Sequence, residues 1–322
     1  MQKPRVWNRT QIAEIYHQPL LELVYQAAQI HREFHKPSEV QVCTLQSIKT
    51  GGCAEDCGYC SQSVHHQASV ERQKLLDVDK VLALAKEAKA GGSTRFCMGA
   101  AGREVRDDPD FERILEMVKG VSGMGLEVCC TLGMLEEEQA KKLKSAGLYA
   151  YNHNLDTGEK YYSKVTSTRS YQERLDTIDS VGKAGISLCC GGILGMGETV
   201  EDRIDLLYTL SSLSPAPESV PVNALVPIEG TPMADMGRVD IWDLVRMIAT
   251  ARICIPTAMV RLSAGRESLS DLEQAFCFMA GANSIFSGDK LLTTPGAGRE
   301  EDLRVFTLLG LRPRQPYLGE KM

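Results

Sequence analysis

Residues 51–60 read Gly-Gly-Cys-Ala-Glu-Asp-Cys-Gly-Tyr-Cys and come shortly after a predicted strand at residues 40–45. The segment places Cys53, Cys57 and Cys60 at C-x3-C-x2-C spacing among three glycines. Glycine adopts backbone conformations that other residues avoid, so such a loop can fold its sulfurs around a small inorganic group. Three thiolates are one fewer than a closed four-ligand site needs, and an iron–sulfur cube held by them keeps one iron open.

A zinc ion is the competing occupant of this loop. The three cysteines together with either His65 or His66 would complete a four-ligand zinc set. The spacing of the cysteines favours an iron–sulfur cluster, but it leaves the zinc interpretation open.

The rest of the chain alternates regularly between predicted strands and predicted helices. Repeated βα units predict a parallel sheet, and eight of them allow a closed TIM-type (β/α)8 barrel. An open doubly wound sheet is the less favoured fold, because its first βα turn would carry a Gly-rich phosphate loop where this chain carries cysteines. The eight strands are predicted at residues 40–45, 94–98, 126–132, 149–155, 186–190, 220–226, 259–263 and 284–286.

The barrel is predicted to occupy residues 39–312 as a single domain. Residues 1–38 form an N-terminal helical extension that Pro19 breaks into two helices, because proline cannot continue a helix. Residues 313–322 are predicted to be a C-terminal tail.

The composition is that of an ordinary soluble globular protein, with 322 residues, 43% hydrophobic and 24% charged. A net charge of −6 without a basic block argues against nucleic acid as a partner. The chain has no apolar run of transmembrane length and no signal-peptide pattern, so we expect a cytoplasmic protein away from membranes. Eleven cysteines in that compartment predict metal or redox chemistry in place of disulfides.

Beyond the first predicted strand, three of the predicted strands carry further cysteines. In a βα barrel the chemistry gathers at the carboxyl ends of the strands. Side chains alternate along a strand, so only one thiol of a neighbouring pair can face the interior. One inward thiol per strand would give a second three-thiolate set, from Cys97, from Cys129 or Cys130, and from Cys189 or Cys190.

Spacing alone leaves this second site open, since a single buried cysteine in a strand is usually a small hydrophobic residue. We interpret Cys43, Cys254 and Cys277 in that way.

Polar residues mark the fourth predicted strand and the segment after the fifth. Asn152, Asn154 and Asp156 are two apart and should share one face, which would put a row of hydrogen-bonding groups inside the barrel. Residues 191–199 contain four glycines, which fits either close approach of the backbone to a ligand or a loop followed by Thr199 as a helix N-cap.

These motifs resemble the radical S-adenosylmethionine superfamily and, within it, the biotin synthase family. The resemblance extends over about residues 40–312 and is specific because many separate segments match together. The matching segments are residues 51–60, 95–101, 151–157, 171–174, 191–199, 260–266, 278–286 and 291–295.

The resemblance implies two iron–sulfur clusters. Cys53, Cys57 and Cys60 would hold a 4Fe–4S cluster whose open iron binds S-adenosylmethionine. A 2Fe–2S cluster would be held by three interior thiols and an arginine, an unusual ligand because arginine is almost always a charged donor. Its implied ligands are Cys97, Cys129, Cys189 and Arg261.

The resemblance also implies the binding residues of the two small molecules. S-adenosylmethionine would contact Tyr59, Asn154, Asp156, Arg174 and Ile193, with the ribose at Asn154 and Asp156 and the methionyl carboxylate at Arg174. Dethiobiotin would place its ureido ring at Asn154 and Asn223 and its carboxylate at Thr293 and Thr294.

The implied reaction is sulfur insertion into dethiobiotin to form biotin, the last step of biotin biosynthesis. S-adenosylmethionine would be cleaved to a 5′-deoxyadenosyl radical, and the second cluster would supply the sulfur. The implied partners are a second copy of the chain in a homodimer, a flavodoxin- or ferredoxin-type reductant and iron–sulfur assembly proteins. The alternatives are another radical S-adenosylmethionine enzyme and a zinc-stabilised barrel that serves as a binding module.

Overall fold

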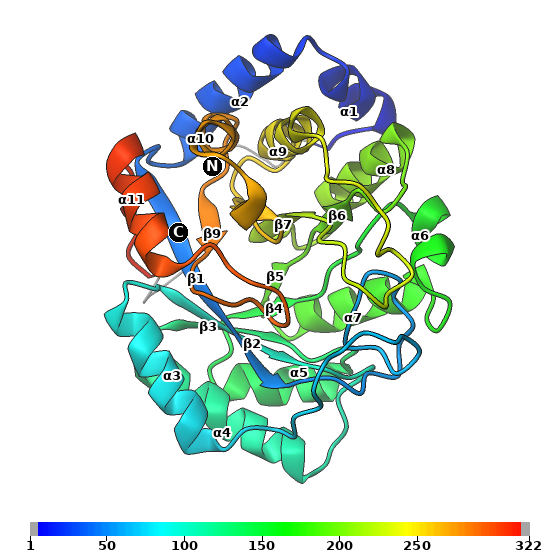
Figure 1. Ribbon diagram of the computed structural model, residues 1–322, viewed down its shortest axis with the longest axis vertical. Helices are drawn as coiled ribbons and strands as arrows, with labels where there is room; N and C mark the ends of the chain where they lie inside the picture. The colour runs from blue at the N-terminus through cyan, green and yellow to red at the C-terminus, as the bar shows by residue number, and fades with distance from the viewer. Residues whose placement is uncertain (1–5, 317–322) are drawn as a thin grey trace.

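Eight parallel strands close into a barrel in the computed structural model, which describes residues 6–316 (Figure 1). Their order around the barrel is β1, β2, β3, β4, β5, β7, β8 and β9, and β9 pairs with β1 to complete the ring. The predicted TIM-type barrel is therefore confirmed, and the open doubly wound sheet is excluded. The strands are β1 Glu39–Lys49, β2 Arg95–Ala100, β3 Glu127–Thr131, β4 Ala150–Asn152, β5 Ser187–Cys189, β7 Ser219–Ala224, β8 Met259–Leu262 and β9 Ser284–Phe286.

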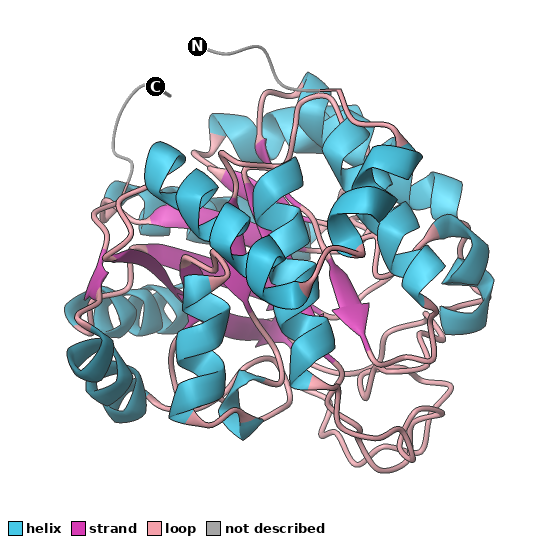
Figure 2. Cartoon of the chain, turned by 90° about the horizontal axis from the view of Figure 1, so that it is seen from above, coloured by secondary structure: helices cyan, strands magenta, loops and turns pink. Residues whose placement is uncertain are grey.

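A layer of helices surrounds the barrel, as the cyan helices around the magenta strands show (Figure 2). Many of these helices begin at a side chain that accepts a hydrogen bond from the first turn, which satisfies a main-chain N–H that has no partner within the helix. Ser170, for example, accepts from Glu173 N, and the Glu173 side chain bonds back to Ser170 N. The helices are α3 Val78–Ala90, α4 Pro109–Gly123, α5 Glu137–Ser145, α6 Glu159–Val165, α7 Tyr171–Lys183, α8 Val200–Ser212, α9 Ile241–Cys254, α10 Asp271–Met279 and α11 Arg299–Leu309.

Two further helices precede the barrel, α1 Arg9–Tyr16 and α2 Leu20–Phe34. The predicted break at Pro19 is confirmed, because proline cannot donate a hydrogen bond within a helix, and Pro19 is the N-cap of α2. The two helices lie against α8 and α9 on the outside of the barrel (Figure 1). Among residues 6–316, no helix is both long enough and apolar enough to cross a membrane.

Several short elements escaped the sequence prediction. The predicted fourth strand at residues 149–155 is shortened to β4, and a separate strand β6, Gly192–Leu194, pairs with β7. Helix α6 and the short 3-10 turn Arg266–Ser268 were also not predicted. Each of these elements spans seven residues or fewer, too short for a periodic apolar pattern to stand out.

The end of the chain packs against the first strand of the barrel. Strand β10, Arg312–Pro313, pairs with the start of β1, and Arg314 donates a hydrogen bond of 2.8 Å to the buried carboxylate of Glu127. The predicted boundary between barrel and tail falls inside β10. Residues 317–322 of the predicted tail lie outside the described residues. The division into a helical extension, a barrel and a tail remains a prediction.

The core of residues 6–316 contains three separate apolar regions, and two of them contain cysteines. A large one lies between the barrel and its helices, and it contains Cys130, Cys190, Cys254 and Cys277. A small one fills the interior of the barrel and consists of Cys43, Cys97, Cys129, Ala150 and Cys189. The prediction that one thiol of each cysteine pair faces inward is thus confirmed, with Cys129 and Cys189 as the inward members.

Gly191 allows the turn between β5 and β6 to approach β7 closely. A Cβ atom built on Gly191 would lie 1.9 Å from the main-chain oxygen of Pro221, so the backbone would have to move. We expect Gly191→Ala to lower the free energy of unfolding by about 3 kcal/mol or more, measured by urea denaturation. Gly123→Ala is the matched control, because its Cβ would meet nothing within 4 Å in α4. Equal stability of the two variants would contradict this prediction.

Candidate active site

A cavity of about 330 Å³ opens at the carboxyl ends of the barrel strands. Its walls come from the cysteine loop, from the ends of the strands and from the segment after β9. Of the predicted site residues, all but Cys189 border this one cavity, namely Cys53, Cys57, Tyr59, Cys60, Cys97, Cys129, Asn154, Asp156, Arg174, Ile193, Asn223, Arg261, Thr293 and Thr294.

The cysteine loop turns back on itself at its two leading glycines. Gly51 and Gly52 have φ angles of 73° and 75°, a region that favours glycine. Cys53 N then donates to Gln62 O at 2.9 Å, which closes the loop across its base. Burial raises the pKa of the Cys60 thiol to about 12, so this sulfur ionises at neutral pH only when a metal takes the place of its proton. This chemistry fits a thiolate cluster site.

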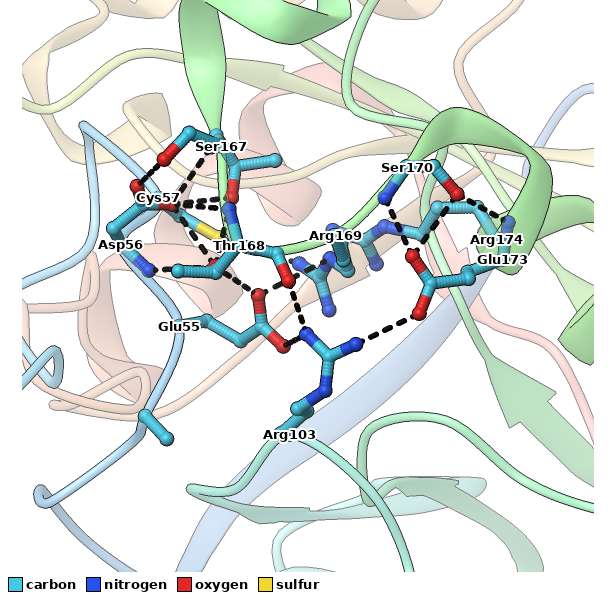
Figure 3. A network of polar contacts seen from close by, with 12 residues as sticks. Glu55, Asp56, Cys57, Arg103, Ser167, Thr168, Arg169, Ser170, Glu173 and Arg174 are labelled. Carbon is cyan, nitrogen blue, oxygen red and sulfur yellow. Dashed lines mark hydrogen bonds and ion pairs between the residues drawn. The ribbon is translucent and has the colours of Figure 1, made fainter.

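Asp56 clamps the loop to the segment that precedes α7 (Figure 3). Its carboxylate accepts hydrogen bonds from Thr166 Oγ1 at 2.6 Å, from Ser167 N at 2.9 Å and from Thr168 N at 3.2 Å. Partial burial opposes the charged form, but the bonds from Ser167 and Thr166 hold the pKa of Asp56 well below its usual range. The loop is therefore fixed at its centre by a charged acceptor that stays ionised.

Glu55, the residue before it, forms a second clamp and is 3% exposed. Arg103 Nη1 lies 2.6 Å from its carboxylate, and Thr168 Oγ1 also donates to it. Arg103 continues to Glu173 at the start of α7, at 2.7 Å (Figure 3). Arg169 also points into this region and donates to Cys57 Sγ at 3.3 Å. A cationic donor thus sits beside one of the three loop sulfurs.

The two histidines of the zinc interpretation hold the loop backbone. His65 Nε2 lies 3.0 Å from Ala54 O, and His66 Nε2 lies 3.0 Å from Cys57 O, so each ring donates to a main-chain carbonyl. Within residues 6–316, no three Cys, His, Asp or Glu side chains gather closely enough to hold a single metal ion. Both histidine rings are therefore engaged with main-chain carbonyls of the cysteine loop.

A buried ion pair lines another part of the cavity wall. Asp156 Oδ2 lies 2.5 Å from Arg174 Nη2, and both residues are at most 6% exposed. Arg174 also donates through Nε to Tyr162 at 3.0 Å. Burial opposes the charge, but the carboxylate of Asp156 keeps the pKa of Arg174 above its usual value. The wall therefore presents a fixed charge pair next to the cysteine loop.

The predicted alternation of side chains is wrong beyond Asn152, because β4 ends there. Asp156 takes a left-handed conformation with φ of 67°, which Asp and Asn tolerate better than most residues. Asn154 and Asp156 still border the cavity, but so does His153, which strict alternation along one strand would turn to the other face.

We expect Asp156→Asn to be strongly destabilising, because it leaves the buried charge of Arg174 without its partner. Asparagine also tolerates the left-handed backbone, so the change isolates the charge. The expected loss is about 3–5 kcal/mol in the free energy of unfolding, measured by urea denaturation. The control is Asp179→Asn, which removes an exposed pair with Lys183 and should cost about 0–1 kcal/mol. Equal losses of stability in the two variants would show that the buried pair contributes no more to the free energy of unfolding than the exposed pair.

The glycine-rich segment 191–199 contains strand β6 and then a loop that ends at a helix cap. Glu198 accepts from Gly195 N at 3.0 Å and from Met196 N at 2.8 Å, which orders the loop. Thr199 is the N-cap of α8 and accepts from Asp202 N. Both sequence interpretations hold in part, because Ile193 of the same segment also borders the cavity.

Arg261 lies among the interior thiols and is fully buried. Its guanidinium donates to Cys189 Sγ at 3.5 Å, to Ser284 Oγ at 3.0 Å and to Gln41 Oε1 at 3.2 Å. Cys43 lies in the same cluster, 3.8 Å from Ser284 Oγ. Cys43 is fully buried in an apolar cluster, as we expected of a small hydrophobic residue, but its neighbours there also include thiols and a serine hydroxyl.

The charge of Arg261 is not paired with a carboxylate among the ion pairs of residues 6–316. Gln41 separates it from Glu127, which already holds Arg95 at 2.9 Å and Arg314 at 2.8 Å. Burial disfavours this charge, yet the neighbouring cysteines Cys43, Cys189 and Cys97 keep the pKa of Arg261 above its usual value. A buried cation needs a compensating anion. The interior site therefore fits an anionic group held by the thiols.

Comparison with known proteins agrees with this geometry. Residues 47–210 match the model of the Radical SAM superfamily, and residues 221–312 match the Biotin and Thiamin Synthesis associated domain. The biotin synthase of Cytophaga hutchinsonii is 61% identical over 97% of this chain and 92% of its own length. The chain belongs to the biotin synthase family. Two further biotin synthases agree. That of Gloeobacter violaceus is 59% identical over 95% of this chain and 96% of its own length. The mitochondrial biotin synthase of Arabidopsis thaliana is 56% identical over 98% of this chain and 83% of its own length.

As a member of the biotin synthase family, the chain is a radical S-adenosylmethionine enzyme that inserts sulfur. Membership of the superfamily implies a 4Fe–4S cluster with S-adenosylmethionine. The matched superfamily region begins within β1, ends within α8 and includes the three loop cysteines.

Two solved structures share the fold of this biotin synthase family member at low sequence identity. Methylornithine synthase has a TM-score of 0.80 at 18% identity, covering 96% of this chain and 94% of that chain. A maturase of the [FeFe]-hydrogenase has a TM-score of 0.82 at 18% identity, covering 96% and 72%. At this identity the likeness shows the fold alone.

Sequence reasoning missed several residues at the site of this biotin synthase family member. Arg103, Thr168 and Arg169 hold the cysteine loop from other parts of the chain. The signal that could have found them is the acidic pair Glu55-Asp56 inside the loop, because buried carboxylates need donors. The sequence does not say which donors meet them.

Proposed function

We propose that this enzyme converts dethiobiotin to biotin with two iron–sulfur clusters in one barrel, and that each cluster has its own set of thiols. The observation that carries the proposal is the meeting of two separate thiol sets at one cavity, the loop set Cys53, Cys57 and Cys60 and the interior pair Cys97 and Cys129. When bound, the loop cluster supplies the electron that cleaves S-adenosylmethionine, and the interior cluster supplies the sulfur that enters the product.

The loop thiols would hold the 4Fe–4S cluster. Their loop is fixed by the two carboxylate clamps, so the three sulfurs are oriented before a cluster binds. Arg169 donates to Cys57 Sγ and would offset part of the negative charge of the cluster and its thiolates.

The wall formed by Asp156 and Arg174 would bind S-adenosylmethionine. A carboxylate accepts hydrogen bonds from ribose hydroxyls, and a guanidinium pairs with a carboxylate in a two-point contact. Asp156 would therefore take the ribose and Arg174 the methionyl carboxylate. Asn154, Tyr59 and Ile193 would complete the pocket, and all three border the cavity.

The interior residues would hold the 2Fe–2S cluster. Cys97, Cys129 and Cys189 are at most 3% exposed, and Arg261 is fully buried beside them. Such burial excludes water from the interior, which protects reactive species from side reactions. Arg261 would act either as a neutral ligand of the cluster or, when protonated, as the cation that compensates its negative charge.

Dethiobiotin would bind between the two thiol sets. Thr293 and Thr294 would hold its carboxylate, and Ser61 Oγ lies 3.0 Å from Thr293 Oγ1, which orients that hydroxyl. Asn154 and Asn223 would face the ureido ring. The Asn223 amide donates to Gly192 O at 2.9 Å and accepts from Ala264 N at 3.3 Å, so its orientation is fixed before the substrate arrives.

The test is anaerobic incubation of the reconstituted protein with dethiobiotin, S-adenosylmethionine and a reductant. We expect biotin together with methionine and 5′-deoxyadenosine, and the visible absorption of two kinds of cluster. Colourless, zinc-loaded protein would favour a zinc-stabilised binding module. Cleavage of S-adenosylmethionine without biotin, in protein that holds a single cluster, would favour another radical S-adenosylmethionine enzyme.

We further propose a homodimer, a flavodoxin- or ferredoxin-type electron donor and iron–sulfur assembly proteins as partners, on the strength of the family resemblance. A cytoplasmic location agrees with the cysteines, because all eleven, located between residues 43 and 277, are free thiols. Size-exclusion chromatography with light scattering tests the dimer directly.

A further inference from the structure

The interior of the barrel holds four thiols, one more than the cysteine pattern predicted. Cys43 projects from β1, has none of its surface exposed and packs in the same small cluster as the other three. Its sulfur lies 3.8 Å from Ser284 Oγ, and the same hydroxyl lies 3.0 Å from Arg261 Nε. Cys43 and Arg261 therefore meet at one serine.

The interior side chains form a closed ring. Hydrogen-bonding contacts join the thiols in sequence, from Cys43 to Cys97, from Cys97 to Cys129 and from Cys129 to Cys189. Cys189 accepts from Arg261 at 3.5 Å. The pairing of β1 with β9 closes the ring, because it brings Ser284 beside Cys43. A group bound to the three predicted cysteines would border both Cys43 and Arg261.

The two residues differ in their ability to bind iron. A protonated guanidinium has no lone pair to donate, and arginine is almost always protonated in proteins. A cysteine binds iron as a thiolate, and a 2Fe–2S cluster ordinarily has four such ligands. As a thiolate, Cys43 is therefore a stronger iron ligand than Arg261. It lies beside the position that Arg261 takes in the predicted ligand set.

We propose that Cys43 is an alternative fourth ligand, which completes a four-thiolate 2Fe–2S site when the side chain of Arg261 does not coordinate iron. The inference rests on the proposed assignment of a cluster to this interior site. On coordination, the sulfur of Cys43 donates a lone pair to iron and its proton passes to solvent, so no electron is transferred.

The test compares Arg261→Met, Cys43→Ala and the variant with both changes, each reconstituted anaerobically with iron and sulfide. Methionine fills much of the space of arginine but offers no nitrogen. Arg261→Met should retain the interior cluster, judged by iron and sulfide per chain and by visible absorption. Its reduction potential should fall below that of the unaltered chain, because thiolate replaces a nitrogen donor. The double variant should have about tenfold or more lower occupancy at the interior site.

The matched control adds Cys277→Ala to Arg261→Met. Cys277 is also fully buried, but it lies on α10 in the outer core, so this variant should keep the interior cluster. The loop cluster should persist in every variant and thereby reports that the barrel has folded. Cys43→Ser, which keeps a polar atom beside Ser284, replaces Cys43→Ala if the alanine variant does not fold.

Two results would overturn the inference. One is loss of the interior cluster from Arg261→Met alone, and the other is equal occupancy in Arg261→Met and the double variant. An unaltered chain that holds the loop cluster and no interior cluster would overturn the proposed function, and this inference with it. The two failures are therefore distinguishable.

Discussion

Replacing Cys53 with alanine should abolish the cleavage of S-adenosylmethionine. The loop supplies three thiols, and removing one leaves two ligands for a cluster that needs three. Changes to groups that merely support a metal ligand typically cost about 10–100-fold, so loss of a ligand should cost more than about 100-fold. The measurement is 5′-deoxyadenosine formed per chain under reducing, anaerobic conditions, with iron content measured on the same sample.

The control for Cys53→Ala is His65→Ala. His65 lies in the same loop and donates to Ala54 O at 3.0 Å, so its loss disturbs the loop backbone without removing a sulfur. In a zinc site with His65 as the fourth ligand, the two variants should lose metal together. In an iron–sulfur site, His65→Ala should keep most of its iron and its cleavage activity. Similar loss of metal in both variants would contradict the cluster assignment.

The sequence predicts the barrel well because its pattern repeats. Eight βα units each contribute a strand and a helix-sized segment, so an error in one unit does not change the topology. Strict alternation within a short, continuous strand also predicts that one thiol of each cysteine pair faces inward, whereas the choice of Cys129 and Cys189 came from the family resemblance. Cys129 and Cys189 lie inside β3 and β5, where that condition is met.

Alternation fails where the strand stops. Asp156 was assigned to the strand face that it would occupy if β4 reached residue 155, but β4 ends at Asn152. The chain then turns through the left-handed Asp156, which forms a parallel bridge with Gly192 in the neighbouring segment after β5. That turn depends on β6, a strand of three residues whose partner lies about thirty residues further along the chain. Local sequence carries little information about such a pairing.

The environment of Cys43 could not be read from the sequence for a related reason. Its polar neighbour Ser284 is separated from it by 241 residues, and the two meet only because β9 closes the barrel against β1. The clamps on the cysteine loop are also distant in sequence, with Thr168 separated from Glu55 by 113 residues. The positions of the thiols could therefore be predicted from the sequence. The groups that surround them could be identified only from the structure of the closed barrel.

Replacing Cys189 with alanine should block the formation of biotin while leaving the cleavage of S-adenosylmethionine in place. Cys189 belongs to the interior set and accepts a hydrogen bond from Arg261, whereas the loop cysteines are held by a separate network. Loss of this thiol leaves the buried guanidinium with one fewer sulfur and the interior cluster with one fewer ligand. We expect biotin to fall by more than about 100-fold, with 5′-deoxyadenosine still formed.

The matched control is Cys190→Ala, on the neighbouring residue. Cys190 is as fully buried as Cys189, but it lies in the outer core between the barrel and its helices. Its loss should lower the free energy of unfolding by about 1 kcal/mol while leaving biotin formation intact. Full product from Cys189→Ala would refute its ligand role. Equal loss of product in both variants would mean that these cysteines matter for packing, since only one of them faces the interior where the cluster is proposed to bind.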